Sequence, residues 1–167
     1  MNTGEKYLKI SSVPSDIMLG TTSKKIDLAV QHHKTGDLPK AEGIYQRILQ
    51  ADPNQPVALH FLGLIAHQIG ENDRAAKLIS NALKIKPDYA EAHCNLGLTL
   101  KELGRLDEAV TSYKNALAVE PDFALVYSNM GIALKALRRL DEAVASYNKA
   151  IAIKPDYAEA HSNLGNA

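Results

Sequence analysis

Apolar side chains recur along this chain at intervals that fit one face of an α-helix. Leu96, Leu100 and Leu103 are spaced i, i+4 and i+7, which is the spacing of a buried helical stripe. Gly104 interrupts this stripe, and a second one resumes at Ala109. We find no useful length of chain that alternates with the period of two typical of a β-strand. The pattern therefore predicts pairs of helices and an all-α fold.

The helix-pair pattern returns at a fixed interval. PDYAEAHCNLG at 87–97 is repeated almost letter for letter as PDYAEAHSNLG at 155–165, and Pro87, Pro121 and Pro155 lie 34 residues apart. A constant period of this size is typical of a stacked repeat array. We number the repeat positions 1 to 34 and expect a flexible N-terminal segment at 1–21, followed by one repeat domain at 22–167. Its predicted units are 22–55, 56–89, 90–123, 124–157 and a partial unit at 158–167.

Small residues and proline recur at fixed positions in each unit. Alanine or glycine stands at position 8, alanine at position 20 and proline at position 32 of every full unit. Small residues allow two helices to approach closely, because a larger side chain would force them apart. Proline cannot continue a helix and fixes where the second helix ends. Two helices in each full unit, and one in the partial unit, predict nine helices from about residue 22 onward.

These features resemble the tetratricopeptide repeat (TPR) family. The unit AEAHCNLGLTLKELGRLDEAVTSYKNALAVEPDF carries the family's small residue at position 8, glycine at 15, alanine at 20, aromatic residue at 24, alanine at 27 and proline at 32. Departures are mild: Ile79 replaces the aromatic residue of one unit, and Arg138 replaces the glycine of another. The resemblance implies a right-handed superhelix, or α-solenoid, of antiparallel helix pairs. In such a fold the first helix of each pair lines a concave groove.

The groove positions of this family are 2, 5, 6, 9, 12 and 13. Position 6 holds Asn95, Asn129 and Asn163 in successive units. An amide offers both a donor and an acceptor, so it can pair with a peptide backbone of any sequence. The repeats are similar to those that precede the catalytic region of O-linked N-acetylglucosamine transferases, which implies a grip on extended polypeptides. The alternative is a solvated polar position, and under either interpretation we expect position 6 to be exposed.

Other candidate ligand-binding residues occupy neighbouring groove positions. Position 9 is apolar in four units, which predicts either a dry track for ligand side chains or packing between adjacent first helices. Position 12 supplies two lysines, and the repeat 56–89 places an aromatic residue and a histidine at positions 6 and 5, where we expect them to face the groove. These candidates are Phe61, His60, Leu64, Leu98, Ile132, Lys101 and Lys135. The carboxylate clamp of chaperone-binding relatives is absent, since position 2 has no lysine.

Charge and chemistry narrow the expected function. Nineteen basic residues balance nineteen acidic ones, so no overall field favours nucleic acid or an anionic membrane. No apolar run approaches the roughly 20 residues of a membrane span, and the single cysteine, Cys94, favours a cytoplasmic protein. The chain lacks phosphate-loop, nucleophile-elbow and zinc-protease motifs. We therefore expect no catalytic residue, no metal and no cofactor.

Two functions remain open at this point. The first is a non-catalytic protein–protein interaction scaffold that binds an extended peptide or a helix of a protein partner in the groove. The second is the substrate-recruiting N-terminal arm of a larger enzyme, such as a glycosyltransferase related to O-linked N-acetylglucosamine transferases or a sulfotransferase. The chain stops at Ala167, inside the first helix of a unit, which favours a truncated array. Self-association through the groove or the uncapped C-terminal end is a further expectation.

Overall fold

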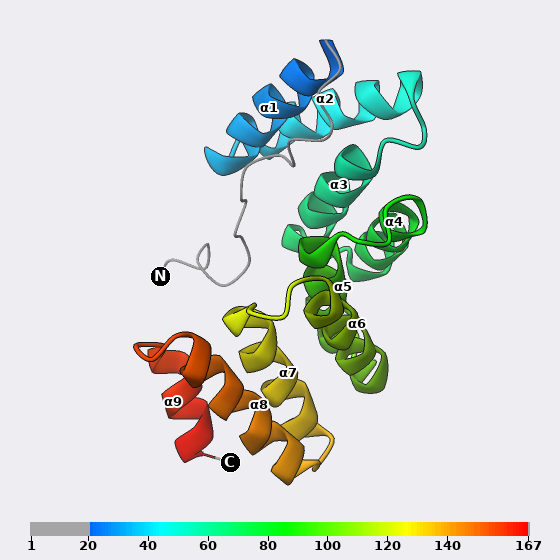
Figure 1. Ribbon diagram of the computed structural model, residues 1–167. Helices are drawn as coiled ribbons and strands as arrows, with labels where there is room; N and C mark the ends of the chain where they lie inside the picture. Colours follow the sequence, from blue (N-terminus) through cyan, green and yellow to red (C-terminus); the bar gives the residue numbers. More distant parts are fainter. Residues whose placement is uncertain (1–20, 167) are drawn as a thin grey trace. The chain divides into compact units, whose positions relative to one another are not determined.

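The chain consists of helices and short loops in the computed structural model, which describes residues 21–166 (Figure 1). No β-strand occurs in that range, and the predicted all-α fold with nine helices is confirmed. The expected flexible segment at 1–21 lies outside the described residues, except for Thr21, which begins the first helix. The helices are α1 (Thr21–Lys34), α2 (Leu38–Ala51), α3 (Pro56–Gln68), α4 (Asn72–Ile85), α5 (Ala90–Glu102), α6 (Leu106–Val119), α7 (Ala124–Ala136), α8 (Leu140–Ile153) and α9 (Ala158–Gly165).

The helices form two compact units, one ending at Pro87 and the other beginning at Asp88. In the first unit α1 pairs with α2 and α3 with α4, and α2 also packs on α3. In the second unit α5 pairs with α6 and α7 with α8, while α6 packs on α7 and α8 on α9. Helices α3, α5, α7 and α9 begin at the first residues of the predicted repeats. The 34-residue period of the sequence is therefore a period of helix pairs.

A residue in the left-handed conformation separates the two helices of each pair. Gly36, Gly70 and Gly104 have φ values of 81°, 84° and 73° at this place. The fourth such residue is Arg138, with a φ of 61°. The next residue, Arg139, donates its backbone N–H to the carbonyl of Leu134 at 2.9 Å, which ends the helix in the way that left-handed caps do.

Glycine at position 8 permits a close contact inside each helix pair of the second unit. A Cβ atom on Gly97 would lie 2.5 Å from Cε1 of Tyr113, and one on Gly131 would lie 2.5 Å from Cε1 of Tyr147. Both tyrosine side chains are fully buried. The aromatic residue at position 24 therefore packs directly on the backbone of the partner helix, and this contact fixes the crossing of the pair.

Candidate functional site

Three asparagines occupy equivalent places in the second unit. Asn95, Asn129 and Asn163 are each the sixth residue of a first helix, on α5, α7 and α9 respectively. Each of these helices begins three residues after a proline. Helix α7 contacts both α5 and α9, so the three helices lie in a row. We call these three residues the asparagine row.

The asparagine row is more buried than the sequence indicated. Only 9% of Asn95 and 7% of Asn129 is exposed, and Asn163 is half-buried. The prediction that position 6 is exposed is therefore wrong for the first two. The Nδ2 atoms of Asn129 and Asn163 are shielded from solvent and have no hydrogen-bond partner among residues 21–166. An unmet buried donor costs about 1–3 kcal/mol, so two of them on adjacent helices require an explanation.

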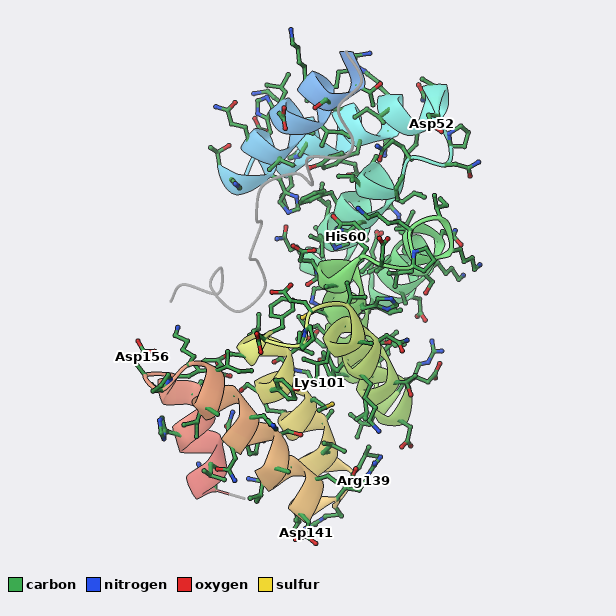
Figure 2. All side chains as sticks on the ribbon, viewed as in Figure 1. Asp52, His60, Lys101, Arg139, Asp141 and Asp156 are labelled. Carbon is green, nitrogen blue, oxygen red and sulfur yellow. The ribbon has the colours of Figure 1, made fainter. Side chains whose placement is uncertain are left out.

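Two lysines lie further along the same helices. Lys101 is near the C-terminal end of α5, where Figure 2 labels it, and Lys135 occupies the equivalent place on α7. Both side chains are half-buried. Lys135 Nζ donates to the backbone carbonyl of Asn166, just after α9. Lys101 has no ion-pair or hydrogen-bond partner in the part of the chain that the structure describes.

The apolar residues at position 9 differ in their exposure. Leu64 and Leu98 are only 5% and 4% exposed, whereas Ile132 is half-buried. Of the two alternatives left open by the sequence, burial favours helix packing for Leu64 and Leu98. Ile132 keeps part of its surface accessible beside the asparagine row.

The first unit uses the equivalent positions for its own core. Phe61, at position 6, is 4% exposed, and His60 is 2% exposed. The Phe61 ring stacks on that of Tyr45, with centroids 5.6 Å apart and planes inclined by 9°. The ring centroids of His33 and His60 lie 6.0 Å and 5.3 Å from the ring centroid of Phe61. The interpretation that Phe61 and His60 line an open groove is wrong, because both side chains are almost fully buried. Figure 2 labels His60.

Burial also determines the charge of the histidines in this cluster. Desolvation, with a smaller contribution from the charge of His33, lowers the pKa of His60 to about 3. Burial likewise lowers the pKa of His33, against the opposing effect of its hydrogen bond to Gln68. His33 Nε2 lies 3.0 Å from Oε1 of Gln68, while its Nδ1 is buried with no partner among the described residues. Both imidazoles are therefore neutral at pH 7.

The single thiol is poorly suited to nucleophilic chemistry. Cys94 is 3% exposed. Burial, assisted by the charges of Glu91 and Glu120, raises the pKa of its thiol to about 12. Because the thiolate is the nucleophile, very little of the reactive form exists at neutral pH. Within residues 21–166, no group of three or more His, Cys, Asp or Glu side chains is arranged to hold a metal ion.

The sequence did not reveal that position 6 changes its role between the units. The one sequence signal was the replacement of asparagine by an aromatic residue, Phe61, which in the structure stacks on Tyr45. The sequence reasoning also missed the hydrogen bond between His33 and Gln68, which joins residues 35 positions apart. In the second unit the structure places Asn95, Leu98 and Lys101 on α5, Asn129, Ile132 and Lys135 on α7, and Asn163 on α9. It places His60, Phe61 and Leu64 in the core of the first unit.

Comparison with known families identifies the fold. The profile of the family described as TPR repeat matches residues 63–104, 99–137 and 133–167. The chain belongs to the tetratricopeptide-repeat family. No curated protein sequence matches it. None of the helices within residues 21–166 has the length and apolar character needed to cross a membrane.

Solved structures of TPR proteins are similar to this chain. One crystal structure of MamA is 25% identical, covers 90% of this chain and 84% of its own, and gives a TM-score of 0.77. A second MamA structure is 26% identical over 87% of this chain and 79% of its own, with a TM-score of 0.78. The structure of the APC/C hetero-tetramer Cut9–Hcn1 gives a TM-score of 0.81 over 87% of this chain and 29% of that chain. At 22% identity it shows likeness of fold alone.

Proposed function

We propose that this TPR protein is a non-catalytic scaffold whose second unit holds an extended peptide of a partner protein along the asparagine row. The family supports a protein partner, since stacked helix pairs build extended binding surfaces. The side chains gathered on α5, α7 and α9 are amides, ammonium groups and apolar residues. Such a set suits recognition better than bond cleavage, and the buried thiol beside it is protonated at neutral pH.

One observation carries the proposal. Asn129 Nδ2 and Asn163 Nδ2 are buried donors without an acceptor among residues 21–166, and they stand one repeat apart. Neighbouring packed helices are separated by about 8–10 Å, and an extended chain advances about 3.3–3.6 Å per residue. A peptide crossing α7 and α9 therefore brings a backbone carbonyl to each helix about every third residue. A rotation of each asparagine side chain toward the surface would let these carbonyls meet the two unsatisfied donors.

The alternative proposal makes these repeats the substrate-recruiting arm of a larger enzyme, a glycosyltransferase or a sulfotransferase. It rests on the similarity of the asparagine row to the peptide grip of O-linked N-acetylglucosamine transferases. The same amides would then hold an acceptor polypeptide. Both proposals make the same prediction for the site, and turnover of a nucleotide sugar or a sulfate donor by the full-length gene product would favour the arm.

The test begins with a phage-displayed library of random dodecapeptides selected on the full chain, followed by calorimetry with the most enriched peptide. Asn129→Ala and Asn163→Ala should each weaken binding about three- to thirtyfold, because each removes hydrogen bonds worth about 0.5–1.5 kcal/mol. Thermal stability should stay level or rise, since each change removes a buried donor with no partner. A loss of affinity without a loss of stability separates a binding role from a structural one.

The matched control is Lys114→Ala on α6, an exposed side chain outside the row. Its affinity for the selected peptide should equal that of the parent. If the double variant Asn129→Ala/Asn163→Ala binds as tightly as the parent, the asparagine row does not hold the ligand and the proposal is wrong. Failure of the library to yield any peptide that prefers the parent over the double variant would also contradict it.

A further inference from the structure

Among the described residues, exposed cations such as Lys77 and Lys114 form no ion pair, but Lys101 is half-buried and also lacks one. Elsewhere a basic side chain at a helix start is paired with an acid three residues away: Lys40 with Asp37 at 2.7 Å, and Arg105 with Glu108 at 2.6 Å. Arg139 pairs with Glu142 at 2.6 Å in the same way. Lys101 is more enclosed than the exposed Lys40 and Arg105, yet no pair is formed with it among residues 21–166.

The sequence around Lys101 explains why it stays unpaired. On a helix surface only residues three or four positions away are close neighbours. For Lys101 the neighbours on α5 are Gly97 and Leu98, neither of them acidic, because the helix ends at Glu102. Lys135 has the equivalent surroundings, with Gly131 and Ile132 at the same spacings on α7, which ends at Ala136.

The acids of the same helices lie elsewhere. Glu91 and Glu159 are the second residues of α5 and α9, where the helix dipole favours a negative charge. Glu91 is ten residues before Lys101, or about 15 Å along the helix axis. Glu102 follows Lys101 directly, but consecutive side chains diverge by about 100° around a helix. Lys101 and Lys135 therefore lie near the C-terminal ends of α5 and α7, away from Glu91 and Glu159 at helix N-termini.

Three unmet groups at positions 6 and 12 of α5, α7 and α9 are donors, while the buried hydroxyl of Ser128 on α7, also without a partner among the described residues, can donate or accept. Two are the Nδ2 atoms of Asn129 and Asn163, and the third is the ammonium group of Lys101, which has no acceptor function. Lys135 shows which kind of acceptor an ammonium group binds at this position, since its Nζ donates to the carbonyl oxygen of Asn166. The surface thus fits a ligand that presents oxygen acceptors, and at Lys101 the strongest acceptor is a carboxylate.

We propose that Lys101 selects partner peptides that carry an aspartate or glutamate side chain, which it pairs with while the asparagine row holds the backbone. This inference rests on the proposed function and adds the chemistry of the partner. The amides give affinity that is independent of sequence, because every peptide offers carbonyls. Lys101 gives preference, because only an acidic side chain supplies the opposite charge. Lys135 contributes less, since its ammonium group already donates to Asn166.

The experiment compares selections from the same random dodecapeptide library on the parent chain and on Lys101→Met, which keeps the length of the side chain and removes its charge. Parent binders should be enriched in Asp and Glu at one fixed place in the aligned peptides, and Lys101→Met binders should lack this enrichment. For one selected peptide, replacing its acid by the matching amide should weaken binding to the parent about three- to tenfold in low salt. The same replacement should leave binding to Lys101→Met unchanged.

Two controls separate this inference from the proposed function. Asn129→Ala should weaken the binding of the acidic peptide and of its amide version by the same factor, so that the preference for the acid is retained. Lys114→Met on α6 should retain both the affinity and the preference. If binding depends on the asparagine row but the parent and Lys101→Met yield peptides of equal acid content, Lys101 selects nothing and only this inference fails. If the acid preference disappears with Lys114→Met instead, the partner contacts α6.

Discussion

The two units of this protein place the same repeat position in opposite roles. In the second repeat of the first unit position 6 is Phe61, enclosed by the rings of Tyr45, His33 and His60, while Asp27 of the first repeat is exposed. In the second unit it is asparagine, and two of the three amides keep a buried donor without a partner among the described residues. Position 12 diverges in parallel. In the first unit it holds His33 and His67, which hydrogen-bond Gln68 and Asn72, and in the second unit it holds Lys135 and the unpaired Lys101.

The difference teaches that the backbone of a TPR does not decide which surface binds. Both units set their helices by the same devices, namely a small residue at position 8, a bulky residue at position 24 and a left-handed residue between the helices. Side-chain chemistry at a few positions then either completes the core or leaves polar groups unmet. The first unit gains stability from this position, whereas the second unit retains a local cost that a ligand would relieve.

The largest effect is expected from giving the first unit the residue of the second. Phe61→Asn should lower the free energy of unfolding by about 3–5 kcal/mol, because it removes a fully packed aromatic side chain and its stack on Tyr45. Urea denaturation followed by circular dichroism measures the change. Phe61→Leu, which stays apolar, should cost much less. An unchanged denaturation midpoint for Phe61→Asn would mean that position 6 is no more a core position in the first unit than in the second.

The fold was largely predictable from the sequence, and the reason is physical. A strict period makes every local signal appear several times, so the places of Gly97, Tyr113 and Pro121 are supported by their counterparts in other repeats. The helix pairing, the nine helices and the close approach at position 8 follow from this repetition. Burial at position 6 was not predictable, because it depends on contacts between helices far apart in the sequence, such as the stack of Tyr45 on Phe61.

The residue types of the candidate site were predictable from the sequence, but their burial and hydrogen bonding were not. The period placed Asn95, Asn129 and Asn163 in register, and the amide chemistry indicated peptide binding. The sequence did not indicate that the Asn129 amide is buried with an unmet donor, since neighbouring side chains determine which hydrogen bonds remain available. For the same reason, the lack of an ion-pair partner for Lys101 became visible only in the structure.

A second, smaller effect should come from pH, and it should arise in the first unit. The pKa of His60 is lowered to about 3 in the folded protein, from an ordinary value of 6.5. The unfolded chain therefore binds more protons between these values, so stability is fully present above pH 6.5 and is lost as the pH falls toward 3. Between pH 7 and pH 5 the loss should be about 2 kcal/mol. Urea midpoints at the two pH values measure it.

The control for this prediction removes the titrating group. His60→Leu has a similar volume and no proton to gain, so its urea midpoint should vary much less between pH 7 and pH 5. Amide hydrogen exchange should show the acid-induced loss of protection in α3 before α7. Equal pH dependence in His60→Leu and the parent would place the acid sensitivity in another group, and the contrast between the units would not include their histidines.

The smallest effect concerns the left-handed residue between paired helices, which is arginine instead of glycine in one pair of the second unit. Arg138 adopts a φ of 61° where Gly36, Gly70 and Gly104 serve in the other pairs. A left-handed conformation costs a residue with a Cβ atom about 1–2 kcal/mol, while glycine costs about 0.5–1 kcal/mol in lost chain freedom. The Arg138 side chain is exposed, and no ion pair is formed with it among residues 21–166. Arg138→Gly should therefore stabilise the protein by about 0.5–1 kcal/mol, measured as an increase in the urea midpoint.

The converse change, Gly104→Arg, should destabilise the protein by a similar amount. If Arg138→Gly lowered the midpoint, the arginine side chain would contribute an interaction that outweighs its backbone strain, and position 15 would then differ between the pairs in function as well as in residue type.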